Sequence, residues 1–259
     1  MRSELRLALP TLYGFLLVLT RVSGALVFVP LPGIKSGPEP ARVALALGFA
    51  VALFPAWPAV SLSGFGFGQL GLWLVAEAAF GITVGVAVSF LTEGLLVACQ
   101  VIGLQAGYSY ASTIDPATQA DSNVLQVFAQ LMASLLFFAL GVDRQIIRVF
   151  VKSLEVYPPG GFVAQLSSAE AVLRLGADMF STGLRLAMPV LALLVLVDIA
   201  LALLGRIHAQ LQLLTLAFPV KMLAALALLT AVSVVFLPVY RAAAGRTVST
   251  LFSVMARTP

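Results

Sequence analysis

Four ionisable side chains stand alone in apolar surroundings, and inside a membrane such groups are the ones most able to do chemistry. They are Arg21, Glu77, Glu93 and Asp198. Single membrane acids relay protons in pumps and transporters, so a proton-coupled secondary transporter is one hypothesis. The acids are not clustered within one segment, which favours burial of each acid against a basic group of its own or a neighbouring chain. We therefore predict buried charged helix residues at these positions.

Other chemistry-bearing residues are too few for a catalytic constellation. His208 is the only histidine and Cys99 the only cysteine. These counts exclude a histidine-pair metal site, a thiolate cluster and an intrachain disulfide. The sequence also has no GxSxG elbow, HExxH motif or P-loop. We expect no enzyme activity, no cofactor and no metal site.

The composition places the chain among membrane proteins. Hydrophobic residues make up 61% of the sequence and charged residues only 10%, whereas soluble domains carry about 25% charged residues. The net charge is +4, but the basic residues are scattered singly and form no basic run. Isolated positive charges between apolar segments are typical of membrane topology. We therefore expect a lipid environment and no nucleic-acid binding.

Apolar segments recur along the chain at lengths suited to helices. A helix needs roughly 20 apolar residues to cross a bilayer. No segment shows the sustained period of two that a transmembrane β-barrel requires, so the predicted fold class is all-α. The segments that either cross the membrane or form buried hairpins are Leu7–Val29, Val43–Phe54, Leu70–Phe90, Gly94–Thr113, Val124–Val142, Leu186–Leu204 and Met222–Tyr240.

Charges and prolines make these segments poor candidates for independent spans. An ionised group at the bilayer centre costs roughly 2.5–3.5 kcal/mol on insertion scales. Helices with this many charges must pack into a polar assembly or fail to cross the membrane fully. Glu77 and Glu93 lie on successive segments or on two halves of one long helix. The more polar stretch Ser167–Arg185 is predicted to be a helix at the water boundary or against a partner.

Two further patterns concern helix faces. Gly81 with Gly85, and Gly103 with Gly107, have the spacing that lets helix backbones approach closely in membranes. Arg144, Arg148 and Lys152 recur every fourth residue and so share one helix face. We favour a solvated or headgroup-facing edge for this basic face, and the alternative is a contact surface for an acidic partner.

Several motifs follow one another along nearly the whole chain. They are Arg21-Val22-Ser23-Gly24, Pro30, Gly33, Pro38, Arg42, Pro55, Gly103-Leu104-Gln105-Ala106-Gly107, Ala111, Ile114-Asp115-Pro116, Gln119, Phe137-Phe138-Ala139-Leu140, Ser153, Pro158, Gly160, Arg206, Gln210-Leu211 and Phe218-Pro219-Val220-Lys221. The most distinctive part is the Asp-Pro element that follows a glycine-spaced helix. Taken in this order, the motifs resemble the FliR family of export-gate subunits of bacterial flagellar type III secretion.

The C-terminal part also resembles a second family. The stretch Gln210–Lys221 is similar to the small two-helix gate subunit FliQ, although Ala209 and Gln212 stand where FliR members usually have proline and asparagine. The resemblance implies one membrane domain over residues 1–259. Its first part, to about residue 180, is FliP-like, and residues 181–259 form a FliQ-like hairpin.

The resemblance implies a function as well. FliR-like subunits join FliP-like and FliQ-like ones in a helical pore complex of kinked, proline-broken hairpins, with an FlhB-like switch protein and other export components as partners. The complex is a gated conduit for unfolded flagellar proteins and a base for rod assembly. The complex belongs to the inner membrane and the flagellar basal body. Because much of it lies above the plane of the membrane, the resemblance implies fewer membrane spans than seven. The equivalent subunit of a virulence injectisome is the alternative.

Two groups of site residues follow from the resemblance. Tyr110–Asn123 is similar to the plug loop that closes the conduit before export, and its central residues are Ile114, Asp115, Pro116 and Gln119. An Asp-Pro pair favours a turn, and the polar neighbours suit contact with water. The second group lies around the turn of the last hairpin and consists of Arg206, Gln210, Phe218, Pro219 and Lys221. These residues either contact neighbouring subunits or anchor the hairpin to lipid headgroups, and the sequence does not distinguish these two roles.

Overall fold

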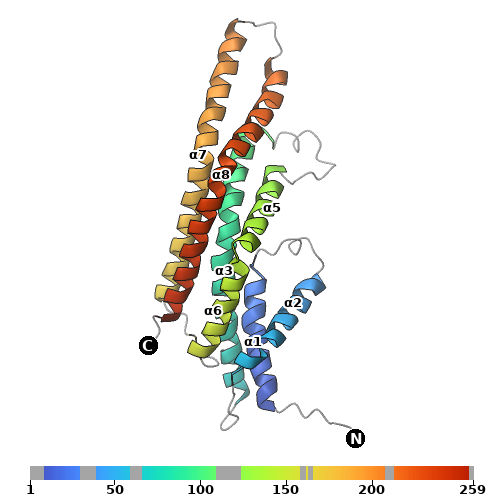
Figure 1. The fold of residues 1–259 in the computed structure, drawn as a ribbon, viewed down its shortest axis with the longest axis vertical. Helices are drawn as coiled ribbons and strands as arrows, with labels where there is room; N and C mark the ends of the chain where they lie inside the picture. The colour runs from blue at the N-terminus through green and yellow to red at the C-terminus, as the bar shows by residue number, and fades with distance from the viewer. Residues whose placement is uncertain are drawn as a thin grey trace. The chain divides into compact units, whose positions relative to one another are not determined.

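A computed structural model of the chain describes residues 9–29, 39–58, 66–108, 124–157, 162, 166–207 and 213–256. Across these ranges the regular elements are helices, without a strand, which confirms the all-α prediction. The elements, drawn in Figure 1, are α1 (Leu9–Leu26), α2 (Glu39–Ala52), the 3-10 turn η1 (Phe54–Ala56), α3 (Phe67–Ala106), α5 (Val124–Ala139), α6 (Val142–Val156), α7 (Leu166–Ile207) and α8 (Leu213–Ala256).

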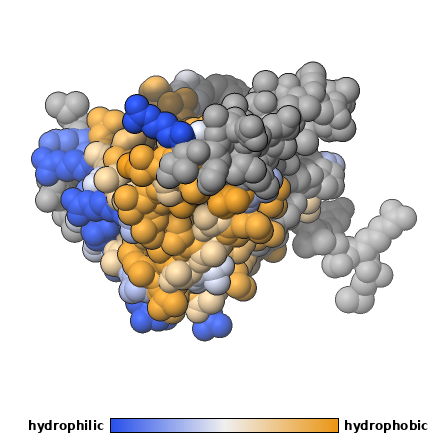
Figure 2. All heavy atoms as spheres, turned by 90° about the horizontal axis from the view of Figure 1, so that it is seen from above, coloured by the Kyte–Doolittle hydropathy of each residue, from blue (hydrophilic) through white to orange (hydrophobic). Residues whose placement is uncertain are grey.

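Three helices are long and apolar enough to cross a membrane within the described part of the chain. They contain the spans Gly68–Ala106, Ser168–Arg206 and Ala217–Met255. A fourth span is possible if α5 and α6, which are bent by 63° relative to each other, count as one broken span. Figure 2 shows apolar side chains over much of the coloured surface, with hydrophilic ones toward its margin. The chain is therefore a multi-pass membrane protein.

The count of seven apolar segments is wrong as a count of separate spans. Leu70–Phe90 and the start of Gly94–Thr113 belong to one helix, α3, which carries both Glu77 and Glu93. Ser167–Arg185 and Leu186–Leu204 likewise fall within α7. A single polar residue within an apolar stretch does not by itself end a helix. A long helix can continue through that position when the polar side chain faces protein instead of lipid.

Prolines occur inside the two C-terminal helices. Pro189 lies within α7, and Pro219 and Pro238 lie within α8. Each proline removes one intrahelical hydrogen bond, and neighbouring helices make this tolerable in membrane proteins. Pro55 instead follows the end of α2, within η1. Proline therefore ends helices in one part of the chain and is accommodated within them in another.

The chain forms two compact units that interleave along the sequence. Unit 1 comprises residues 1–90, 141–176 and 245–259, and unit 2 comprises residues 91–140 and 177–244. The helices α3, α7 and α8 each contribute residues to both units. The predicted division near residue 180, into FliP-like and FliQ-like parts, concerns ancestry rather than compactness and stays a prediction.

In unit 1, α1 crosses α3 at a run of small residues. A Cβ added to Gly81 would collide with the carbonyl oxygen of Arg21, and one added to Gly85 would lie 2.5 Å from the carbonyl oxygen of Ala25. On α1, a Cβ at Gly24 would lie 3.0 Å from the carbonyl oxygen of Ala78. The two backbones therefore touch directly, and the interpretation of Gly81 and Gly85 as a close-packing pair is confirmed.

In unit 2, the second glycine pair has a different role. Gly107 lies beyond the end of α3 with φ +86°, a left-handed conformation that side chains disfavour. Its N–H donates to the carbonyl of Leu104 (3.2 Å), and the N–H of Tyr108 donates to the carbonyl of Gly103 (3.0 Å). These two bonds make a Schellman cap. Gly107 therefore caps α3 rather than lying within it, and it also allows a close approach, because an added Cβ would lie 2.8 Å from Cδ1 of Phe218 on α8.

Candidate functional site

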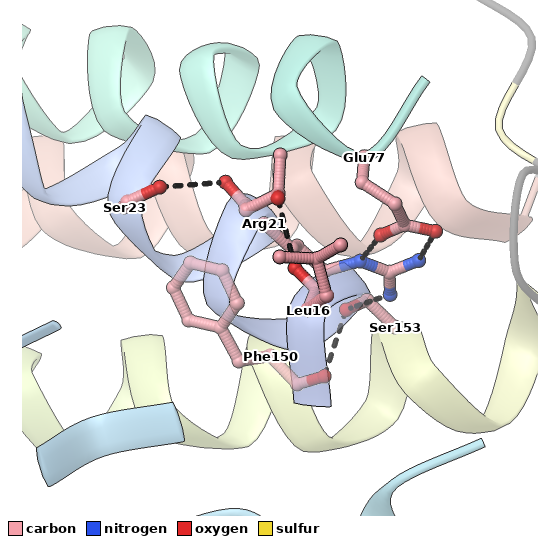
Figure 3. A network of polar contacts seen from close by, with 7 residues as sticks. Leu16, Arg21, Ser23, Glu77, Phe150 and Ser153 are labelled. Atoms are coloured by element: carbon pink, nitrogen blue, oxygen red, sulfur yellow. Dashed lines mark hydrogen bonds and ion pairs between the residues drawn. The ribbon is translucent and has the colours of Figure 1, made fainter. Parts of the chain in front are cut away.

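The centre of unit 1 contains a buried ion pair between α1 and α3. Arg21 and Glu77 are each 1% exposed. The guanidinium donates to both carboxylate oxygens: Nε to Oε2, and Nη2 to Oε1 at 2.9 Å (Figure 3). This two-point geometry is the strongest form of an arginine–carboxylate contact. The pair forms where two glycines bring the backbones together, so a long arginine reaches the neighbouring helix easily.

A third helix joins this cluster through Ser153 on α6. Arg21 Nη1 donates to Ser153 Oγ at 2.9 Å, and that hydroxyl in turn donates to the carbonyl of Phe150 at 2.7 Å. The ring of Phe80 lies 5.0 Å from the guanidinium carbon, within cation–π range. Arg21 thus binds α1 to α3 and α6 at one point. We call Arg21, Glu77, Ser153 and Phe80 the buried arginine cluster.

Aromatic side chains cover this cluster. Phe80 packs against Tyr157 and Phe162 with ring centroids 5.9 and 5.2 Å away. All three rings are buried. Tyr157 also donates its hydroxyl proton to backbone carbonyls of Val254 and Met255 at 3.3 and 3.4 Å, which links α8 to the same core. An apolar cover of this kind keeps water away and strengthens the ion pair.

A second polar cluster lies in unit 2 and joins three helices. Lys221 Nζ on α8 lies 2.9 Å from Asp198 Oδ1 and 3.1 Å from Oδ2. Gln105 on α3 donates to Asp198 Oδ2 at 2.9 Å. The side chains of Lys221 and Asp198 are 15% and 40% exposed. We call this group the Asp198 cluster, and its partial exposure makes it a weaker interaction than the buried arginine cluster.

Contacts around the Asp198 cluster hold the end of α3. The Tyr108 hydroxyl donates to the carbonyl of Met222 at 3.1 Å. A Cβ on Gly107 would lie 2.8 Å from Cδ1 of Phe218, so the ring of Phe218 packs against the glycine of the helix cap. These contacts place the last turn of α3 against α8. The next residues, 109–123, lie outside the part of the chain that the structure describes.

The predicted site residues are therefore not all in comparable environments. Arg21 and Glu77 are buried and paired with each other, whereas Glu93 on α3 and Asp198 on α7 are only half-buried. Arg206 and Pro219 are exposed, and Phe218 and Lys221 are half-buried. The residues that lie outside the described ranges are Ile114, Asp115, Pro116, Gln119 and Gln210.

Residue pattern alone missed three members of these clusters. Ser153, Phe80 and Gln105 are ordinary residues on helices, and nothing in their spacing points to a charged partner. Ser153 is 132 positions from Arg21, and Gln105 is 93 positions from Asp198. Within the described residues no group of three or more His, Cys, Asp or Glu side chains is arranged to hold a metal ion.

A glycine spacing near the start of α3 also resembles a binding motif. Gly66, Gly68 and Gly71 have the G-x-G-x-x-G spacing of dinucleotide-binding turns. In such turns the glycines allow a phosphate or a packed element to approach the backbone closely. A Cβ added at any of these three positions would meet nothing within 4 Å. The spacing alone therefore does not indicate a nucleotide site.

The basic face of α6 is exposed. Arg144, Arg148 and Lys152 all have exposed side chains, whereas Ile146, Val149 and Phe150 on the opposite face are buried. Lys152 also lies 3.0 Å from Glu155, three residues further along the helix. An exposed pair of this kind contributes little to stability. The choice between headgroups and an acidic partner for this face stays open.

Comparison with known proteins finds a family that matches most of the chain. The family described as "Bacterial export proteins, family 1" matches residues 12–247. The chain is similar to the flagellar biosynthetic protein FliR of Escherichia coli, with 30% identity over 221 residues, 85% of this chain and 84% of that protein. The FliR proteins of Caulobacter vibrioides (28% identity; 84% and 87% of the two chains) and Bacillus subtilis (27%; 87% and 88%) are also similar.

Proposed function

The chain belongs to family 1 of the bacterial export proteins, and on that premise we propose that it forms a gated conduit together with FliP-like and FliQ-like subunits. It is a subunit of the flagellar type III protein export gate, a structural part of the export apparatus in the inner membrane. The match over residues 12–247 carries this conclusion. The proposed cargo is the unfolded flagellar proteins, and an FlhB-like switch protein is a further proposed partner.

The long helices support an assembly with different partners. Within the chain, 44% of the most apolar window of α3 is buried, but only 22% of that of α7 and 17% of that of α8. Such apolar faces must be covered by lipid or by other helices. Leu196 on α7 and Val234 on α8 are examples, with 59% and 79% of their surface exposed. We propose that neighbouring gate subunits cover part of these two faces.

A pull-down in mild detergent tests this assembly. The tagged chain is purified from its native host and analysed by native mass spectrometry. Recovery in one large hetero-oligomer with FliP-like and FliQ-like proteins is the expected result, and it gives the stoichiometry. Recovery alone or as a homodimer would contradict the proposal.

The proposed gate is the segment Tyr110–Asn123, with Ile114, Asp115, Pro116 and Gln119 at its centre. The support comes from the sequence, since the Asp-Pro pair favours a turn. It also comes from the position of the segment, directly after the capped and anchored end of α3.

Deleting Ile114–Gln119 is expected to make the resting complex leak ions, because the lumen loses its closure. The measurement is sodium or proton leak in cells that express the whole complex. A matched control replaces the same residues with alternating glycine and serine, which keeps the length but removes the Asp-Pro pair. An assembled deletion variant that is as ion-tight as the parent would show that this segment is not the plug.

The turn of the last hairpin is proposed to contact neighbouring subunits through Arg206, Gln210, Phe218, Pro219 and Lys221. Lys221 is expected to contribute most, because its charge is already held in place by Asp198. Since this pair is partly exposed, Lys221→Ala should change the stability of the chain by only about 1 kcal/mol or less.

The loss in Lys221→Ala is therefore expected in assembly rather than in folding. We expect several-fold less of the variant to co-purify with its partners, measured against equal amounts of folded chain. Arg246→Ala, at an exposed position of the same helix, is the control. Normal incorporation of Lys221→Ala into the gate would leave headgroup anchoring as the role of this side chain.

The two alternative functions are less well supported. A proton-coupled transporter needs acids that gain and lose protons, but Glu77 is held by Arg21, and Asp198 by Lys221 and Gln105. Both acids are therefore already partners of side chains on neighbouring helices. The injectisome alternative is not favoured, because the relatives described above are flagellar proteins.

A further inference from the structure

The exposed face of α6 carries two arginines whose charge is not neutralised within the chain. Arg144, Arg148 and Lys152 lie one helical turn apart, and all three side chains are exposed. Lys152 is paired with Glu155 at 3.0 Å. In the part of the chain that the structure describes, neither arginine forms a hydrogen bond or an ion pair. Both guanidinium groups are therefore available to an anionic partner.

The packing of unit 1 fixes the direction in which this face points. On the opposite face of α6, the ring of Phe150 lies edge-on to that of Phe49 on α2, with centroids 6.4 Å apart. Ser153 Oγ accepts a hydrogen bond from Arg21 Nη1 at 2.9 Å. Phe150 and Ser153 are both buried. Because these contacts hold the inner face, α6 cannot turn its arginines toward the core.

An apolar turn packs beside α6 in the same unit. The turn is η1, at the end of α2. Val51 and Phe54 are 57% and 60% exposed there. Trp57 is half-buried, with its ring centroid 4.9 Å from that of Phe54 and its Nε1 donating to the carbonyl of Ala50 at 2.8 Å. Exposed aromatic side chains next to cations are typical of the boundary between membrane and water.

A layer of lipid headgroups fits the basic face better than an acidic protein does. The distance from Arg144 to Lys152 is eight residues, about 12 Å of helix. A stable protein interface buries about 800 Å² on each partner, and charged residues are depleted at its centre. A strip with a cation at every turn leaves little apolar area for such a centre. Lipid phosphates need only charge, and each can approach one cation separately.

We propose that the basic face of α6 binds the phosphate groups of anionic phospholipids, with the η1 turn at the boundary between headgroups and acyl chains. Asp143, the remaining acid of α6, is half-buried in the first turn, where the helix dipole stabilises a negative charge. The attraction therefore comes mainly from Arg144 and Arg148. One basic side chain near an anionic surface strengthens binding about fivefold.

Photo-crosslinking of the purified export complex in nanodiscs tests the proposal. One sample contains phosphatidylglycerol with a diazirine close to the ester linkage, and a second contains phosphatidylcholine with the same group. Modified residues are located by mass spectrometry. We expect crosslinks within residues 142–156 and 51–57, at least about fivefold more with phosphatidylglycerol than with phosphatidylcholine.

Two double variants separate charge from geometry. Arg144→Gln with Arg148→Gln is expected to lower phosphatidylglycerol crosslinking of α6 about fivefold or more, to the level of phosphatidylcholine. Arg144→Lys with Arg148→Lys should keep most of the preference, because the charge stays while the two-point carboxylate geometry of arginine is lost. Arg174→Gln, at an exposed position of α7, is the control and should leave crosslinking of α6 unchanged.

Three results would overturn the proposal. The first is equal crosslinking of α6 by the two lipids in the parent complex. The second is an unchanged preference for phosphatidylglycerol in the double glutamine variant. The third is a crosslink from α6 to a peptide of another protein when a photo-reactive amino acid replaces Ile147, which is 38% exposed between the two arginines. The partner of the basic face would then be protein.

Discussion

Arg21→Met is expected to destabilise unit 1 by about 3–5 kcal/mol, the cost of leaving a buried carboxylate without its partner. Glu77 is 1% exposed and accepts two hydrogen bonds from the guanidinium. Methionine fills a similar volume but donates nothing, so Glu77 loses the counter-charge and the two hydrogen bonds that the guanidinium supplies. Ser153 also loses the N–H that it accepts from Arg21.

The measurement is the thermal unfolding midpoint of the purified complex, which we expect to fall by on the order of 10 °C. Arg174→Met is the matched control. Arg174 pairs with Glu170 four residues earlier on α7, but the two side chains are 78% and 60% exposed. Water replaces that partner easily, so the control should unfold at nearly the parent temperature.

A double variant distinguishes a buried charge from lost packing. When both partners are replaced, as in Arg21→Met with Glu77→Met, no unpaired charge remains, and most of the lost stability should return. A single variant Arg21→Met that unfolds at the parent temperature would show that the pair contributes nothing. A double variant as unstable as the single one would assign the loss to packing with Phe80 and to Ser153.

Gly81→Ala is expected to destabilise the chain by about 3 kcal/mol, although alanine is the better helix former by about 1 kcal/mol. The added Cβ would collide with the carbonyl oxygen of Arg21 and lie 3.1 Å from the backbone nitrogen of Ala25. Both neighbours are backbone atoms of α1, so no side-chain rotation relieves the contact. The helices must move apart, and the guanidinium of Arg21 moves with them.

Gly71→Ala provides the control in the same helix. A Cβ at Gly71 meets nothing within 4 Å, and the position is exposed. Helix propensity then acts alone, so this variant should be as stable as the parent or up to about 1 kcal/mol more stable. Thermal unfolding midpoints of the two variants should therefore shift in opposite directions. A Gly81→Ala variant that is stabilised like Gly71→Ala would show that α1 and α3 are not in backbone contact.

The two predictions are coupled because the residues touch. Gly81 faces the carbonyl of Arg21, the same residue whose side chain binds Glu77. Once Gly81→Ala has displaced α1, the ion pair between Arg21 and Glu77 is already weakened. Replacing Arg21 then removes less stability than it does in the parent chain. The double variant Gly81→Ala with Arg21→Met should therefore lose clearly less stability than the sum of the single losses, as neighbouring sites do.

Sequence by itself determined the class of this protein and the kinds of residue in its core. A composition with 61% hydrophobic residues and isolated charges allows little besides membrane helices. The Gly81–Gly85 spacing was sufficient to predict a close helix contact, because a period of four residues is a local property of one helix. The ordered motifs along the chain likewise indicated the export family before any contact was known.

Only the tertiary structure decided which charges meet. Arg21 and Glu77 are 56 residues apart, and the sequence offered Glu93 and Asp198 as equally isolated acids. Which acid a cation reaches depends on where two helices cross and which faces they turn to each other. The role of Gly107 was decided in the same way. The spacing of Gly107 from Gly103 suits helix packing, but α3 ends at Ala106. Gly107 therefore lies beyond the helix in a left-handed conformation, with φ +86°, and forms its C-terminal cap. Periodicity describes one helix at a time, whereas partners and helix ends depend on the packing of several.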